Sequence, residues 1–157
     1  MQLTRGGEYG LRSVLYLAQQ DTGKISMVST IAEAEAIPPR FLAKIFQMLG
    51  KAGLVKSRRG AKGGFSLTRP ASQITVKEVI EAIDGPLYLN RGTASPLRDI
   101  LEEAQATMVQ VLSRANFADL AKTKQRASSA DLASNLGAGW REPHLRHSDA
   151  VTPVHSA

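Results

Sequence analysis

The chain has 157 residues, a formal net charge of +6 and no cysteine. This length suffices for one domain with a hydrophobic core and an appendage, and the lack of cysteine excludes disulfides, thiol nucleophiles and thiolate-bound zinc or iron–sulfur centres. No stretch approaches the roughly 18 consecutive apolar residues of a membrane span, and the N-terminal "MQLTRGGEYG" lacks the apolar stretch of a signal peptide. We therefore expect a cytoplasmic protein without a membrane partner.

The positive charge is concentrated in one part of the chain. No acidic residue lies between Glu35 and Glu78, whereas the remaining eleven bases and fourteen acids sum to −3. The acid-free interval contains nine bases, Arg40, Lys44, Lys51, Lys56, Arg58, Arg59, Lys62, Arg69 and Lys77. This local excess predicts a polyanionic partner, either nucleic acid or an anionic surface; the alternative is a solvated basic face without a partner.

Three helices are predicted in the first third of the chain. Apolar residues recur at helical spacing from Thr4 to about Gln19, with Thr4 as the cap. Ser26 is expected to cap a short second helix that turns Val28, Ile31 and Ala32 inward.

The third helix begins at Pro38-Pro39, since proline is tolerated in the first turn of a helix. Its sequence "RFLAKIFQMLGKA" predicts a buried face of Phe41, Leu42, Ile45, Phe46 and Leu49, and an outer face of Arg40, Lys44, Gln47 and Lys51. Two helices separated by a short turn have the layout of a helix-turn-helix.

A basic hairpin follows these helices. The runs "LVKSR" and "GFSLT" alternate like strands, and "RGAKG" between them supplies the glycines of a hairpin loop. The loop does not fit a phosphate-binding P-loop, because a strand rather than a helix follows it. The predicted fold class is therefore mainly α with a small β wing, a winged helix-turn-helix.

Two further helices are predicted after the wing. "ITVKEVIEAIDG" begins with a capping box of Thr75 and Glu78 and stops at Asp84-Gly85, and "PLYLNRGTAS" has the composition of an irregular linker. A long helix from Pro96 to about Leu120 carries an apolar stripe of Leu97, Ile100, Leu101, Ala104, Met108, Val111 and Leu112. The stripe predicts a homodimer joined by this helix; the alternative is that it folds back onto the first helix.

Beyond Leu120 the periodicity is lost, which is typical of a mobile tail. The tail's histidines, His144, His147 and His155, lack ligand spacing, so no metal site is predicted there. The expected organisation is a DNA-binding domain at 1–85, a linker at 86–95, a dimerisation helix at 96–120 and a flexible tail at 121–157.

The candidate site residues point to DNA rather than to catalysis. The chain has no nucleophile elbow, no histidine before residue 144 and no carboxylate pair in a recognisable cleft pattern, which argues against an enzyme. In the DNA-binding hypothesis, Pro39, Arg40 and Lys44 face the major groove, while the wing, with Arg58, Arg59, Gly60, Lys62 and Gly63, reaches phosphates or the minor groove. A winged-helix module for protein or RNA contact is the alternative.

Several motifs resemble one known family. They are "LT" at the start, "YGLR" and "LYLA" in the first helix, "FLAKI" and "AGLV" around the third, then "RGAKGGFSL", "PA" and "ITVKEVIEAIDG". From Leu3 to about Leu120 the chain resembles the Rrf2 family of winged-helix regulators, which includes IscR, NsrR and CymR. The resemblance implies a homodimeric DNA-binding regulator, expected to be a repressor, on a partly palindromic operator, with Arg59-Gly60 at the minor groove.

The chain departs from this family where iron–sulfur members bind their cluster. Those members carry three cysteines before the long helix, whereas this chain has "LNRGTASPLRDIL". The resemblance places Ser95 at a cysteine position, Arg98 at a histidine position and Glu8 where an acidic ligand can lie. No cluster is expected, because these residues supply no thiolate. An effector could then occupy the cleft between the Asp84–Pro96 loop and the first helix, or the protein could bind DNA constitutively.

Overall fold

The computed structural model describes residues 3–88 and 97–137, with side chains as far as Ser128. Its elements are α1 (Arg5–Ala18), α2 (Val28–Ala34), α3 (Pro39–Lys51), β1 (Val55–Arg58), β2 (Gly64–Leu67), the short 3-10 helix η1 (Ala71–Gln73), α4 (Val76–Asp84), α5 (Arg98–Arg114) and α6 (Phe117–Gly137). The predicted fold class, mainly helical with a small β wing, is confirmed.

The core is built by the inner faces of α1, α2, α3 and α4, with contributions from the start of β1, the residue Ile74 before α4 and the start of α6. Its most buried side chains include Val14, Ile31, Leu42, Phe46, Leu49, Ile74 and Val79. The prediction that Phe41 belongs to the core is wrong, because this residue is 61% exposed. Phe41 lies one residue before Leu42, about 100° around the helix, so it stands at the edge of the apolar stripe.

The start of α2 also differs from the prediction. Met27 is the N-cap residue and makes no side-chain capping bond, so Ser26 is not the cap. Ser26 instead pairs as a short strand with β2: its N–H donates to the Phe65 carbonyl at 2.9 Å, and the Phe65 N–H donates to the Ser26 carbonyl at 2.9 Å. Ser26 is therefore buried against the wing, where its backbone holds β2 beside the helices.

The wing is an antiparallel hairpin in which Val55 pairs with Leu67 and Arg58 with Gly64. The Phe65 ring on β2 stacks on the Phe46 ring of α3, with 4.4 Å between centroids and 19° between planes. Such aromatic pairs add to the free energy gained by burial. The hairpin is thus fixed to the same helix whose outer face carries the predicted base-contacting residues.

The predicted long helix is broken in two. The Ala115 carbonyl accepts from the Val76 N–H at 2.9 Å, and the Phe117 N–H donates to the Ile74 carbonyl at 3.1 Å, so this short stretch is extended backbone. Asn116 then opens α6 by accepting from the Asp119 N–H at 3.0 Å. A single helix over 96–120 is therefore wrong, because pairing with the segment before α4 interrupts it.

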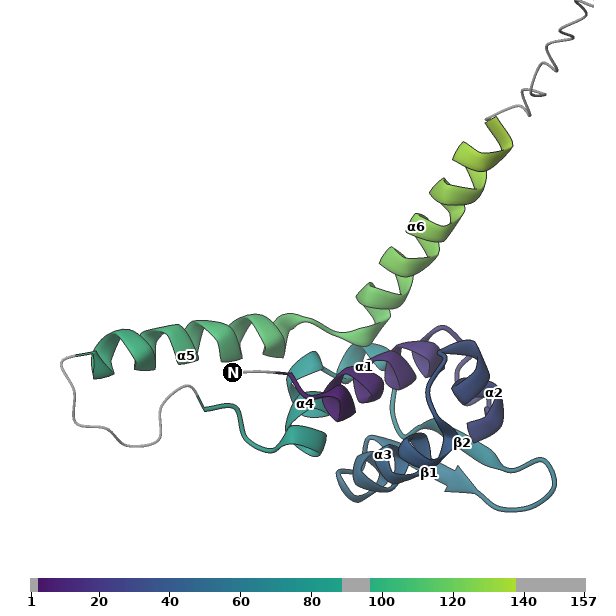
Figure 1. The fold of residues 1–157 in the computed structure, drawn as a ribbon, viewed down its shortest axis with the longest axis horizontal. Coiled ribbons are helices and arrows are strands. Elements are labelled where there is room, and N and C mark those ends of the chain that lie inside the picture. Colours follow the sequence, from purple (N-terminus) through teal and green to yellow (C-terminus); the bar gives the residue numbers. More distant parts are fainter. Residues whose placement is uncertain (1–2, 89–96, 138–157) are drawn as a thin grey trace, which may run out of the picture.

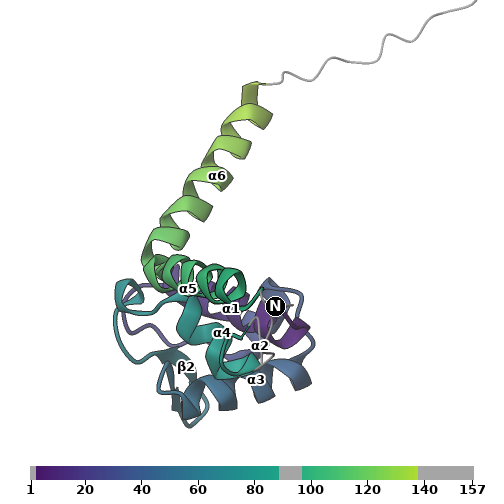
Figure 2. The same ribbon diagram turned by 90° about the vertical axis from the view of Figure 1, so that its left-hand side faces the viewer.

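The chain remains helical from Phe117 to Gly137, so the predicted mobile tail does not begin after Leu120. Figures 1 and 2 show α6 projecting from the body, with α5 lying on the same side as its base. Residues 138–157, with the three histidines, lie outside the described residues. In the part of the chain that the structure describes, no helix is long and apolar enough to cross a membrane.

Candidate nucleic-acid interface

The turn between α2 and α3 sets the direction of the predicted recognition helix. Ala36 adopts a φ of 50°, and the Ile37 N–H donates to the Ala32 carbonyl at 2.9 Å. This left-handed residue ends α2, and it buries Ile37 before Pro38 and Pro39 begin the next helix. The predicted turn at Ile37 therefore depends on the conformation of its neighbour Ala36.

The acidic residue before this turn is buried and bound by two cations. The Glu35 side chain is 10% exposed and lies 3.3 Å from Arg12 Nε on α1 and 3.3 Å from Lys124 Nζ on α6. Arg12 also donates to the Glu35 carbonyl. The base of α6 is thus attached directly to the turn of the helix-turn-helix.

The predicted base-contacting residues of α3 are all accessible. Pro39, Arg40 and Lys44 are exposed, at the N-terminal half of the helix. Figures 1 and 2 show α3 and the hairpin along one side of the molecule, opposite the side from which α6 projects. The arrangement leaves this face free of the C-terminal helices.

The wing loop exposes the remaining predicted contacts, Arg58, Arg59 and Lys62. Gly63 closes the loop by donating its N–H to the Gly60 carbonyl at 2.8 Å, and a Cβ on Gly63 would lie 2.4 Å from the Arg58 carbonyl oxygen. Gly60 has a φ of 113°, which glycine alone adopts without strain. The loop's own geometry therefore requires both glycines, whatever approaches it.

The nine bases of the acid-free interval divide into two groups. Arg69 pairs with Glu78 at 2.5 Å, and Lys77 pairs with Glu81 at 2.6 Å. The other seven, Arg40, Lys44, Lys51, Lys56, Arg58, Arg59 and Lys62, are exposed and form no salt bridge with any acid whose side chain the structure describes. Seven exposed cations on α3 and the hairpin, without a salt-bridge partner among the described acids, give this part of the molecule a positive potential, which attracts polyanions.

The residues at the family's cluster-ligand positions do not form a cluster site. Glu8 lies 3.7 Å from Arg12 and is 55% exposed, and Arg98 lies 2.6 Å from Glu102. Ser95 lies outside the described residues. The chain has no cysteine, and its described residues contain no group of three or more His, Asp or Glu that could hold a metal ion. A thiolate-bound cluster does not fit this donor set.

The predicted dimerisation stripe on α5 is divided lengthwise. Leu101, Met108 and Leu112 are half-buried on the edge nearer α4, whereas Leu97, Ile100 and Val111 are 60%, 64% and 60% exposed, and Ala104 is exposed beside them. The sequence also allowed the long helix to fold back onto α1. In the structure it is the start of α6 that packs on α1, and Phe117 and Ala121 are buried there. Within the part of the chain that the structure describes, one edge of the stripe thus remains exposed.

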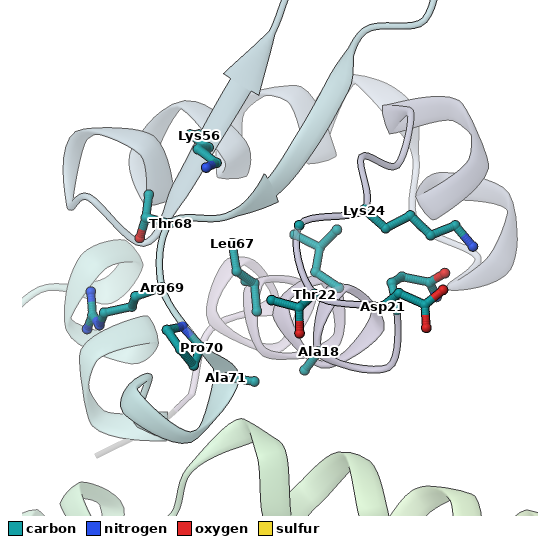
Figure 3. Close-up of a pocket in the computed structure, with 13 residues that line it drawn as sticks. Ala18, Asp21, Thr22, Lys24, Lys56, Leu67, Thr68, Arg69, Pro70 and Ala71 are labelled. Carbon is teal, nitrogen blue, oxygen red and sulfur yellow. The ribbon is translucent and has the colours of Figure 1, made fainter.

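Two small cavities, each of about 210 Å³, flank the body. One lies between the turn after α1 and the end of β2 and is lined by Lys24, Lys56 and Arg69; Figure 3 shows Arg69 and Lys24 pointing outward on opposite sides of it. The other lies between Leu3 and Thr4 and the segment 84–88, at the described edge of the predicted effector cleft. The rest of that cleft falls on residues outside the described part.

Comparisons with known proteins agree with this geometry. Residues 3–123 match the model of the Rrf2 family, described as an iron-dependent transcriptional regulator. The chain is 32% identical over 161 residues to Rv1287 of Mycobacterium tuberculosis, whose name places it among HTH-type transcriptional regulators; the match covers 95% of this chain and 100% of that protein. It is 36% identical over 131 residues to the HTH-type transcriptional regulator NsrR of Shouchella clausii, covering 76% of this chain and 88% of that one.

Solved structures of the same family have the same fold. CymR, the global cysteine regulator of B. subtilis, superposes with a TM-score of 0.73 at 27% identity, covering 78% of this chain and 98% of that chain. IscR of T. potens superposes with a TM-score of 0.70 at 28% identity, covering 81% and 90%. The winged helix, the sequence motifs and these matches lead to one conclusion: the chain belongs to the Rrf2 family of transcriptional regulators.

Proposed function

We propose that this protein is a homodimeric repressor that binds a partly palindromic operator in double-stranded DNA without an iron–sulfur cluster. The observation that carries the proposal is the face formed by α3 and the hairpin, with seven exposed cations and no neutralising acid among the described side chains. Its helix is narrow enough to enter a major groove, and its wing would then lie over the adjacent backbone or minor groove.

The cations of α3 and those of the hairpin are proposed to contact different parts of the DNA. Arg40 and Lys44 stand on the exposed face of α3, so they are the proposed base contacts. Arg58, Arg59 and Lys62 extend from the hairpin, and arginine in particular suits a narrow minor groove because of its negative potential. In a dimer, a two-fold axis would repeat this face on the second subunit, so the DNA would need two half-sites.

Binding to the chain's own upstream DNA tests the proposal, measured by fluorescence anisotropy across a range of salt concentrations. Affinity should fall steeply with salt, because each neutralised phosphate releases counterions. Arg59→Ala and Lys44→Ala should each cost more than about 1 kcal/mol of binding free energy if the side chain reads a groove, and less, with a shallower salt slope, if it contacts only a phosphate.

Lys77→Ala is the matched control. It removes the same charge from the same acid-free interval, but Lys77 lies on α4 and is paired with Glu81. Losses of equal size in all three variants would contradict the assigned face. Tighter binding to single-stranded RNA than to the duplex would favour the alternative RNA-binding function, and a reporter gene that rises when the protein is deleted would support repression.

A further inference from the structure

A third cavity, larger than the two described above, lies between the start of α1, the end of α4 and the length of α3 from Pro38 to Met48. Its volume is about 530 Å³, within the range of roughly 300–1,000 Å³ that small-molecule sites occupy. Tyr9, Phe41, Met48 and Ile83 form an aromatic and aliphatic wall around it. Phe41, with 61% of its surface exposed, is the residue whose core position was wrongly predicted, and it stands instead at the rim of this cavity.

Two of the three charged side chains at the cavity are cationic. Arg5 and Lys44 both line it, and neither forms a salt bridge with an acid whose side chain the structure describes. The carboxylate that also lines it, Asp84, accepts hydrogen bonds from the Thr4 N–H at 3.1 Å and from the Thr4 hydroxyl. Asp84 is thus held at the cap of α1, which leaves the cavity with an excess of one positive charge.

We propose that this cavity binds a small organic anion with an apolar, ring-sized body, which antagonises DNA binding. The body would lie against the aromatic and aliphatic wall, because burial of apolar surface drives such binding. The anionic group would face Arg5 and Lys44, since charge complementarity selects an anion over a neutral molecule of the same shape.

The link to DNA rests on the proposed function, because Lys44 lines the cavity and also belongs to the proposed DNA-contacting face. An anion beside Lys44 would compete with the DNA for that cation. Phe41 belongs to the same helical turn, so a ligand packed on its ring would also occupy space beside the helix entering the groove. The two ligands should therefore weaken each other's binding reciprocally.

Two fluorescent probes test the cavity on the full-length protein without DNA. Anilinonaphthalenesulfonate supplies an aromatic body with an anionic group, and N-phenylnaphthylamine supplies a similar body without charge. We expect saturable binding of the anion at one site per chain, weakened about threefold or more by Arg5→Ala, with the neutral probe unaffected by that change. Phe41→Ala should weaken both probes, and circular dichroism should confirm that the variants fold.

The controls are Lys24→Ala, which removes an exposed cation elsewhere, and Met27→Ala, which shortens an exposed apolar side chain away from the cavity. Neither should alter either affinity. Absence of saturable binding, or equal losses in the controls, overturns the proposal. Binding that appears only after the α5 stripe is disrupted by Ile100→Lys with Val111→Lys also overturns it, because a second copy of the chain would then cover the cavity.

A second titration separates this proposal from the proposed function. Without probe, the protein's affinity for its upstream DNA tests DNA binding alone. With saturating anionic probe, the apparent Kd for DNA should rise about threefold or more in the wild type, and by a smaller ratio in Arg5→Ala. Saturable probe binding that leaves the DNA affinity unchanged overturns the antagonism, whereas loss of DNA binding in the absence of probe overturns the proposed function instead.

Discussion

Glu35 connects three parts of the molecule through one side chain. It begins the segment between α2 and α3, its side chain is 10% exposed, and its two carboxylate oxygens each lie 3.3 Å from a cation, one from Arg12 Nε and the other from Lys124 Nζ. The cations remain 37% and 46% exposed, so they are partly solvated and their attraction to the carboxylate is moderated. The main role of Glu35 is therefore positional: it holds α1 and α6 at the turn of the helix-turn-helix.

Replacing Glu35 by Gln should lower the free energy of unfolding by about 1–2 kcal/mol, because two charge-assisted contacts are lost while a buried polar group remains. Urea denaturation followed by circular dichroism measures this. Glu33→Gln is the matched control, an exposed acid on the same helix, and it should change stability by less than about 0.5 kcal/mol. Indistinguishable losses in the two variants would show that the Glu35 contacts contribute nothing specific.

Glu78 links the wing's exit to α4. Burial by itself would raise the pKa of Glu78, but hydrogen bonds from Thr75 and the charge and hydrogen bond of Arg69 outweigh it, so the pKa lies below the ordinary value of 4.5. A carboxyl group whose pKa is lowered by folding stabilises the protein above its unfolded pKa. That contribution is lost as the pH falls through the lower, folded pKa.

Glu78→Gln should therefore make stability less sensitive to acid. The free energy of unfolding, measured from neutral pH down to about pH 3, should fall less steeply in the variant than in the wild type. Glu103→Gln, which removes an exposed carboxylate from α5, provides the comparison. The hypothesis fails if both variants reduce the acid dependence of the free energy of unfolding by the same amount.

At the scale of elements, the hairpin and α6 are each attached to the helical body by a few specific contacts. The Phe46–Phe65 stack fixes the hairpin to α3, and the Ser26–Phe65 pairing fixes it to the start of α2. For α6 the attachment is Phe117, which is 1% exposed in the core, with Ala121 one turn further on. Beyond these residues the described side chains of α6 as far as Ser128 are exposed.

Truncating Phe117 to Ala should cost about 3–5 kcal/mol of stability, since it removes a ring from a packed core and leaves a cavity. Leu120→Ala, three residues along the same helix and 38% exposed, should cost less than about 1 kcal/mol. Thermal and urea unfolding compare the two. A small loss for Phe117→Ala would mean that α6 is not anchored through the core.

At the scale of the whole molecule, no element among residues 3–88 and 97–137 covers the exposed edge of α5. Ile100 and Val111 are 64% and 60% exposed on it, while the opposite edge of the stripe faces α4. Symmetric pairing of two copies is the commonest way in which soluble proteins cover such a surface. This edge is the proposed dimer contact.

Ile100→Lys combined with Val111→Lys should convert the protein to a monomer at micromolar concentration, because four lysines would face each other across a two-fold interface. Since both residues are exposed, the single chain should stay folded. The control Ala106→Lys with Gln110→Lys adds the same charge to exposed positions on the opposite face, and it should remain dimeric. Analytical ultracentrifugation measures the mass, and a monomeric wild type would refute the dimer.

The helix-turn-helix, the wing and the capping box of Thr75 and Glu78 could all be predicted, because each depends on short-range signals. Apolar spacing, proline at a helix start and glycines in a hairpin loop act within a few residues of one another. The concentration of positive charge was visible for the same reason. Its division into seven uncompensated and two paired cations was not predicted: the pairing of Lys77 with Glu81 follows from their spacing of four residues on α4, whereas Arg69 reaches Glu78 only in the folded structure.

Three predictions proved wrong because of how segments pack in the folded chain. Ser26 has the type of side chain that caps helices, but its backbone forms hydrogen bonds with Phe65, which lies far along the chain. The stripe from Leu97 onward is continuous in sequence, yet Asn116 leaves the helix because the segment around Thr75 pairs with it. Phe41 has an apolar side chain typical of a protein core, but the orientation of α3 about its own axis leaves this side chain exposed to solvent.

The order and type of the DNA-binding elements, the basic character of one interval and the absence of thiolate ligands all follow from the amino-acid sequence. The end of α5, the continuation of the helix beyond Leu120 and the set of residues that meet at the cavity between α1, α3 and α4 follow from packing in the folded chain. Local propensity and composition are properties of neighbouring residues. Long-range pairing and burial depend instead on which surfaces the folded chain brings together, and tertiary contacts override local preference wherever the two compete.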